Sequence, residues 1–119
     1  MSAFKTYKGG RLDLESYKGM TIYFFAIDLF NNDGTEASLS PYQDIRIKLY
    51  QKKHGTLIAS FDFQTGVSTD SPANNTIYWN ATLDEMDLRP KTYWTECHGL
   101  KNTNPLIKEL LFNGVHTVI

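Results

Sequence analysis

Residues 77–97 constrain the fold most, because they place both tryptophans on two apolar segments joined by a short crossing. The first segment contains Trp79 and the second contains Trp94. Pro90 has no backbone N–H group and keeps the residue before it extended, so we expect a new strand to begin just after it. Leucine and methionine side chains on the crossing suit a loop that covers the end of a core. The stretch therefore predicts a strand, a crossing and a second strand at one corner of a β-sheet protein.

Tyr93 falls near the start of the second of these strands. Immunoglobulin-like sandwiches carry a tyrosine corner there, with a buried ring and a hydroxyl bonded to backbone a few residues upstream. An ordinary half-buried strand tyrosine is the alternative, since tyrosine favours strands anyway. If Tyr93 points inward, Thr95 and Cys97 follow it, whereas Trp94 and Glu96 point to the opposite face of the sheet.

Three further segments alternate as strands do. Residues 44–50 and 57–63 are separated by a polar turn, which predicts an antiparallel hairpin. Residues 20–29 are apolar on both faces, whereas an antiparallel strand with one wet face alternates between apolar and polar residues. This strand is therefore either covered on both sides by its own chain or part of a contact surface. Its second apolar face holds Met20, Ile22, Phe24 and Ala26.

The two ends of the chain are ambiguous. Residues 1–16 are polar and contain Gly9-Gly10, so they form an edge strand or an N-terminal arm, and we expect an arm that becomes ordered on a neighbouring subunit. Asn104-Pro105 could start a helix. The segment from 104 onward also fits one long strand with a glycine bulge at Asn113-Gly114, which is the interpretation we adopt. Together these segments predict an all-β, immunoglobulin-like antiparallel sandwich of about seven strands over residues 17–119.

Composition narrows the range of partners. The net charge is −1, from 12 basic and 13 acidic residues, so no overall field attracts nucleic acid or an anionic membrane. The single cysteine excludes an internal disulfide, and the first residues lack the apolar run of a signal peptide. We therefore expect synthesis in a reducing cytoplasm, with no nucleic acid and no membrane as partner.

Catalytic patterns are missing from the sequence. His54, His98 and His116 show no spacing that would gather a metal ion. Cys97 and His98 are adjacent, so on a strand they point to opposite faces and form no nucleophile–base pair. No serine elbow or phosphate-binding loop is present either. We expect no enzyme, no cofactor and no metal site.

Five short stretches stand out together: Lys-Gly-Met-Thr at 18–21, Asp-Gly-Thr at 33–35, Ile-Tyr-Trp at 77–79, Arg-Pro-Lys-Thr-Tyr-Trp at 89–94 and the run from 110 to 118. In these stretches the chain resembles the immunoglobulin-like N-terminal domain of phage baseplate upper proteins and related virion modules. The resemblance implies an immunoglobulin-like sandwich that packs against other virion proteins in a baseplate, tail, neck or capsid-decorating position.

The function that we expect is therefore structural. The chain would be a homo-oligomeric virion subunit, made in the host cytoplasm, whose contact surface includes Trp94, Ile22 and Phe24. The alternative is a carbohydrate-binding module, in which Trp94, Tyr78 and Tyr50 would be the outward aromatic side chains that stack on a sugar.

Overall fold

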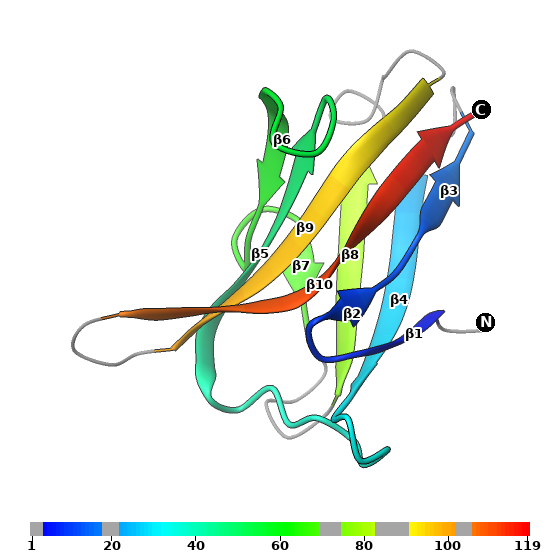
Figure 1. The fold of residues 1–119 in the computed structure, drawn as a ribbon. Helices are drawn as coiled ribbons and strands as arrows, with labels where there is room; N and C mark the ends of the chain where they lie inside the picture. The colour runs from blue at the N-terminus through cyan, green and yellow to red at the C-terminus, as the bar shows by residue number, and fades with distance from the viewer. Residues whose placement is uncertain (1–3, 18–21, 70–74, 83–90, 102–105) are drawn as a thin grey trace.

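Two β-sheets face each other in the computed structural model, which describes residues 4–17, 22–69, 75–82, 91–101 and 106–119 (Figure 1). The described residues contain no helix. Alternating apolar residues account for most of the strands, since each long strand presents one apolar face to the other sheet. The strands are β1 (Phe4–Tyr7), β2 (Gly10–Arg11), β3 (Leu14–Ser16), β4 (Ile22–Phe30), β5 (Tyr42–Tyr50), β6 (Leu57–Phe61), β7 (Val67–Ser68), β8 (Thr76–Thr82), β9 (Lys91–Lys101) and β10 (Ile107–Val118).

The strand order confirms the predicted sandwich. Sheet A has the order β1-β4-β8-β7, and sheet B has the order β2-β10-β9-β5-β6, with β3 also paired to β10. All pairs among the seven strands from β4 to β10 are antiparallel. The N-terminal strands differ from the prediction, because β1 runs parallel to β4 and both β2 and β3 run parallel to β10. Both sheets are therefore mixed.

The core lies between the two inner faces and is centred on Trp79. Its indole is fully buried, 5.3 Å from the ring of Phe61 and 5.7 Å from that of His116 between ring centres. Sheet A also contributes Ile27 and Leu29, which point inward from β4. Burying one large apolar side chain contributes about 1.5–3 kcal/mol, so these inner faces supply the main driving force for folding.

The N-terminal segment forms edge strands on both sheets, instead of the arm that we expected to order on a neighbour. After β1 the chain turns at Gly9, where φ is 79°, and crosses to the edge of sheet B. Leu12 and Leu14 are buried in the core of the same chain. The backbone N–H of Leu12 donates to the carbonyl of Asn113 at 2.8 Å. Residues 4–16 are therefore part of the sandwich.

A polar cluster at one end of the sandwich also holds the N-terminal segment in place. Glu109 on β10 accepts a hydrogen bond from the hydroxyl of Tyr42 at 2.7 Å, and it pairs with Lys8 at 3.2 Å and Lys101 at 3.1 Å. Burial opposes ionisation, but these hydrogen bonds lower the pKa of Glu109 to about 2. The charged glutamate thus joins the turn after β1 to strands β5, β9 and β10.

The C-terminal segment is one strand, as predicted, with its irregularity in a different place. The register with β9 shifts between Leu110 and Phe112, whereas Gly114 stays in register opposite Thr95. A Cβ atom at Gly114 would lie 2.0 Å from the carbonyl oxygen of Leu12, so glycine is required here for the N-terminal segment to approach. Residues 83–90, the crossing that we expected to cover the core, lie outside the described residues, as do 104 and 105.

Candidate functional site: the outer face of sheet A

Aromatic side chains gather on the outer face of sheet A, the side turned away from sheet B. Phe24, Ala26, Asp28 and Phe30 share this face because side chains alternate along β4. Phe24 is 36% exposed and stacks on Tyr78 of the neighbouring strand β8, with 5.8 Å between ring centres and 23° between ring planes. The stack forms an aromatic ridge at one end of the face.

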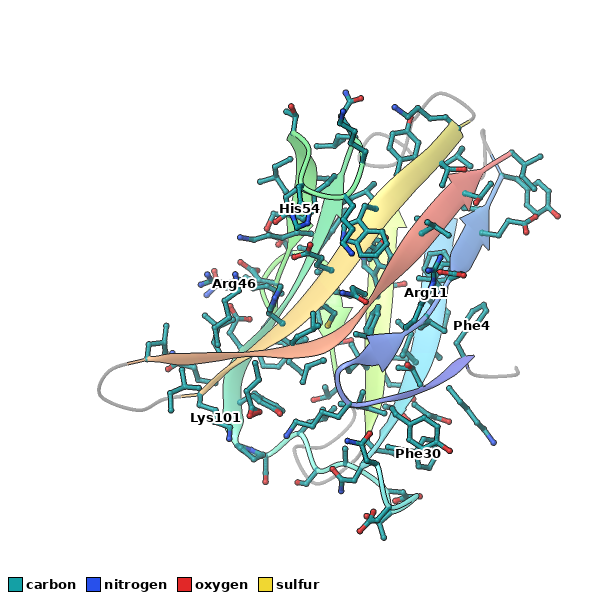
Figure 2. The ribbon with its side chains drawn as sticks, viewed as in Figure 1. Phe4, Arg11, Phe30, Arg46, His54 and Lys101 are labelled. Carbon is teal, nitrogen blue, oxygen red and sulfur yellow. The ribbon has the colours of Figure 1, made fainter. Side chains whose placement is uncertain are left out.

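A hollow of about 220 Å³ lies at the other end of the same face. It is lined by Lys5, Thr6, Tyr7, Phe30 and Gly34. Tyr7 is 56% exposed and lies opposite Phe30 in the parallel pairing of β1 with β4. Figure 2 shows Phe30 at the end of β4, on the opposite side of the molecule from Arg46. We call this the Tyr7 hollow.

The loop after β4 shapes one wall of the Tyr7 hollow. Gly34 has a φ of 89°, a conformation that glycine adopts without strain. One carboxylate oxygen of Asp33 accepts hydrogen bonds from the backbone N–H of Thr35 at 3.0 Å and from its hydroxyl at 2.6 Å. These bonds lower the pKa of Asp33, so the turn keeps its charged cap at neutral pH. The wall is therefore fixed by local hydrogen bonds.

The middle of the face is less apolar. Asp28 on β4 and Thr76 on β8 face each other, and the threonine hydroxyl donates to the carboxylate at 2.5 Å. Ala26 is buried beside them. The face therefore has an aromatic ridge at one end and an aromatic hollow at the other, and the hydrogen-bonded pair of Asp28 and Thr76 lies between them.

The structure corrects the prediction for Trp94. Its direction is as expected, since Tyr93, Thr95 and Cys97 are buried on the inner side of β9 while Trp94 shares the outer side with Glu96. However, Trp94 is only 8% exposed. Its indole N–H donates to Glu96 at 2.9 Å, and the ammonium group of Lys53 lies 5.2 Å from the ring centre. Its own chain covers this tryptophan, so it offers little surface to a partner.

The other residues predicted for the contact surface lie on sheet A. Phe24 is on the exposed outer face. Ile22 is the first residue of β4, and its side chain lies outside the described residues. Tyr93 is buried, as a corner residue must be, but the backbone upstream at 83–90 is not described, so the corner stays a prediction.

The three aromatic residues considered for sugar stacking do not form one platform. Tyr50 and Trp94 are cross-strand neighbours on sheet B. Tyr78 lies on the outer face of sheet A and stacks on Phe24. These residues therefore cannot contact a single sugar chain as one surface.

Sequence reasoning missed two contributors to the site, Tyr7 and Phe30. Phe30 has the same parity as Phe24, so extending the predicted strand by one residue would have found it. Tyr7 lies in the segment that we expected to be an arm, and its parallel pairing with Phe30 leaves no periodic signal.

The titratable groups buried in the core suit packing better than catalysis. The Sγ atom of Cys97 is buried, and burial raises the pKa of its thiol. His116 is fully buried; its Nε2 atom lies 2.8 Å from the hydroxyl of Ser16, and burial lowers its pKa to about 4. A thiol and an imidazole that stay neutral inside a core have no access to a substrate.

No protein-family model and no curated protein matches this chain. Among the described residues, no helix is long and apolar enough to cross a membrane. Nor do those residues bring three or more histidine, cysteine or acidic side chains together in a group that could hold a metal ion.

Proposed function

We propose that this chain is a structural protein that acts by packing against other proteins, as a subunit of a tailed-phage virion. The virion setting is supported by the resemblance of its turn and core stretches to phage baseplate modules. Packing is supported by the outer face of sheet A, where Phe24 and Tyr7 are exposed and Phe30 lines the Tyr7 hollow. Aromatic side chains are the usual anchors of protein interfaces.

The partner that fits this face best is a second copy of the chain. Phe24 and Phe30 lie on the same strand, six residues or roughly 20 Å apart, with the ridge at one end and the Tyr7 hollow at the other. A two-fold axis through the middle of the face would bring the ridge of each copy to the hollow of the other. Such a contact is self-complementary, as a symmetric dimer requires.

Charge and area are compatible with a weak dimer. The net charge of −1 gives only weak repulsion between copies. The face has four strands and its longest strand has nine residues. The other three strands are shorter, so the four together hold 22 residues. With strands about 4.8 Å apart and about 3.3 Å per residue, the face covers roughly 350 Å², so two copies would bury about 700 Å² together. This is smaller than a stable specific interface, so we expect weak association that is seen at high protein concentration.

Sedimentation equilibrium of the full chain tests the dimer. Phe24→Asp places a charge on the ridge and should weaken association at least tenfold, by roughly 1.4 kcal/mol or more. Phe63→Asp is the matched control, because Phe63 is similarly exposed, at 39%, but lies in the turn after β6. Equal association of both variants and the parent would place the interface elsewhere, and a parent that remains monomeric at high concentration would exclude a stable dimer.

The virion setting needs a separate measurement. Mass spectrometry of purified phage particles from a host that produces this chain should find it in stoichiometric amounts after the particles are banded in a density gradient. Its presence only in the soluble lysate would remove the virion role and leave the dimer to be judged by sedimentation alone.

A further inference from the structure

A second hollow, on sheet B, differs in chemistry from the aromatic face. It has a volume of about 340 Å³ and lies between the first half of β5 and the turn after β6. Its lining is mostly polar and consists of Gln43, Asp44, Arg46, Asp62, Phe63 and Gln64. We call it the Phe63 hollow. Its volume is at the small end of ligand sites, enough for one or two sugar rings.

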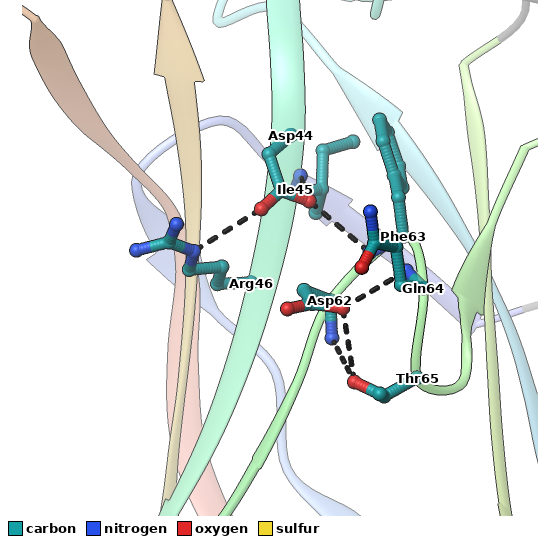
Figure 3. A network of polar contacts seen from close by, with 7 residues as sticks. All are labelled: Asp44, Ile45, Arg46, Asp62, Phe63, Gln64 and Thr65. Atoms are coloured by element: carbon teal, nitrogen blue, oxygen red, sulfur yellow. Dashed lines mark hydrogen bonds and ion pairs between the residues drawn. The ribbon is translucent and has the colours of Figure 1, made fainter.

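Asp44 is held rigidly at one side of the Phe63 hollow (Figure 3). One of its carboxylate oxygens accepts hydrogen bonds from the backbone N–H groups of Ile45 at 2.9 Å and Phe63 at 3.1 Å. Its other oxygen accepts from Nε of Arg46 at 3.1 Å. This last bond orients the guanidinium group while its terminal nitrogens donate to no described residue, so they remain available to a ligand.

Asp62 is held in a similar way at the opposite side. One carboxylate oxygen accepts from the backbone N–H of Gln64 and from the hydroxyl of Thr65, both at 2.9 Å. The hydrogen bond from Gln64 is the main cause of its lowered pKa, so the group is charged at neutral pH. The second oxygen of Asp62 makes no hydrogen bond to a described residue. It therefore offers a fixed acceptor whose orientation is already set before a ligand binds.

The remaining wall is the half-exposed ring of Phe63. An aromatic ring beside fixed carboxylates, a guanidinium donor and two amides matches a molecule with one C–H face and a rim of hydroxyl groups. Two carboxylates and one guanidinium give the lining a net charge of −1, which disfavours anions. The polar lining disfavours a purely apolar ligand. A neutral sugar ring satisfies all of these conditions.

We propose that the Phe63 hollow binds a neutral carbohydrate, with the ring of Phe63 stacked on one sugar face and Arg46 and Asp62 bonded to its hydroxyl groups. This site goes beyond the packing function, because it lies on sheet B and uses none of the residues of the aromatic face. It also differs from the set of Trp94, Tyr78 and Tyr50, which the fold separates.

Heteronuclear NMR titration of the full chain with lactose, maltose and cellobiose tests the proposal. We expect at least one of these neutral disaccharides to shift the amide signals of Phe63 and Gln64, with half-saturation at about 1–10 mM, as is usual for a single weak site. Phe63→Ala should weaken binding about tenfold. Phe4→Ala is the control, because Phe4 is equally exposed but lies on sheet A, and it should bind like the parent.

Three outcomes would overturn the proposal. The first is the absence of shifts at Phe63 and Gln64 with every neutral disaccharide up to about 50 mM. The second is equal binding by the parent and Phe63→Ala. The third is tighter binding of galacturonic acid than of the neutral sugars, which would make the hollow an anion site. If Phe63→Ala unfolds, Phe63→Leu keeps the apolar bulk without the aromatic face and should show the same loss.

Discussion

Large aromatic side chains point outward from both sheets, and Trp94 on sheet B is covered whereas Phe24 on sheet A is exposed. On sheet B, Trp94 is covered by Lys53 and bonded to Glu96, so 8% of it is exposed. On sheet A, Phe24 stacks on Tyr78 and is 36% exposed. Both residues point outward from their strands. The difference lies in what the rest of the chain places over them.

This contrast separates two reasons why an aromatic residue is found on an outer face. Trp94 acts as a cover for its own sheet, with the lysine stem and ammonium group shielding the ring from water. Among the described residues, no lysine ammonium group lies over the ring of Phe24 as Lys53 lies over Trp94. An outward aromatic side chain therefore indicates an interface only when its own chain supplies no cover for it.

The largest expected effect concerns His116, which is buried on the inner side of sheet B. Its pKa in the folded chain is about 4, below its ordinary value of 6.5, because the ring is buried. As the pH falls from 6.5 to 4, the unfolded chain takes up a proton that the folded chain does not. The free energy of unfolding should therefore fall by about 3 kcal/mol across this window, with no contribution from His116 above it.

Urea unfolding of the parent and of His116→Gln at several pH values measures this loss. The variant should lack the part of the pH dependence that belongs to His116, whereas the exposed residue His54 provides the control variant His54→Gln. Identical pH dependence in the parent and in His116→Gln would show that the imidazole is not buried as described.

Trp94→Ala tests whether Trp94 stabilises its own sheet or contributes to an interface. Removing a nearly buried indole should lower the free energy of unfolding by about 2 kcal/mol, while the association constant measured for the proposed dimer stays unchanged. Phe24→Ala should do the reverse, with weaker association and little loss of stability. A Trp94→Ala chain that is fully stable but fails to associate would restore Trp94 as the interface residue that the sequence predicted.

The hollow on sheet A is tested by Tyr7→Ala. Tyr7 is more than half exposed, so its loss should change stability little, but it removes a wall of the hollow that would receive the ridge in the proposed dimer. We expect association to weaken about tenfold, by roughly 1.4 kcal/mol. Tyr17→Ala, at a similarly exposed tyrosine outside the hollow, should associate like the parent. An equal effect of both substitutions would argue against a specific contact.

Two substitutions on the inner side of β9 have the smallest expected effects. Tyr93→Phe removes one hydroxyl and should lower the free energy of unfolding by about 1 kcal/mol if the hydroxyl is bonded as in a tyrosine corner. Thr95→Val removes a buried hydroxyl that has no hydrogen-bond partner among the described residues, so it should be neutral or slightly stabilising. Denaturation midpoints of the two variants compare them directly, and no loss in Tyr93→Phe would count against the corner.

The sequence predicted most of what depends on strand parity. The inward direction of Tyr93 and Cys97, the hairpin of β5 and β6 and the two apolar faces of β4 all follow from alternation within a single strand. Parity also gave the correct direction for Trp94. It could not show that the ring is covered, because Lys53 comes from the turn between β5 and β6, and no local pattern joins that turn to β9.

For the N-terminal segment the sequence left two alternatives, an arm or an edge strand, and our preference for the arm was wrong for a related reason. Its polar composition and Gly9-Gly10 favour an arm, but its order comes from parallel pairing with β4 and β10, which are distant in sequence. Ser16 and His116 meet across nearly the whole chain. The only strand-like signal in the segment was the short alternation from Arg11 to Leu14. The Tyr7 hollow depends on this pairing, so it could not be predicted without it.

Disulfide trapping tests most directly the claim that the open aromatic face joins two copies. The only natural cysteine, Cys97, is buried. In the proposed dimer the ridge of one copy meets the hollow of the other. A chain carrying both Lys5→Cys, in the lining of the hollow, and Asn80→Cys, opposite Phe24 on β8, keeps both aromatic contacts and should form a covalent dimer under mild oxidation. Each single variant should form much less, and a cysteine pair placed at Lys53 and Glu96 on sheet B should give no covalent dimer. Trapping through sheet B, or no trapping through sheet A at concentrations where the parent associates, would contradict the account.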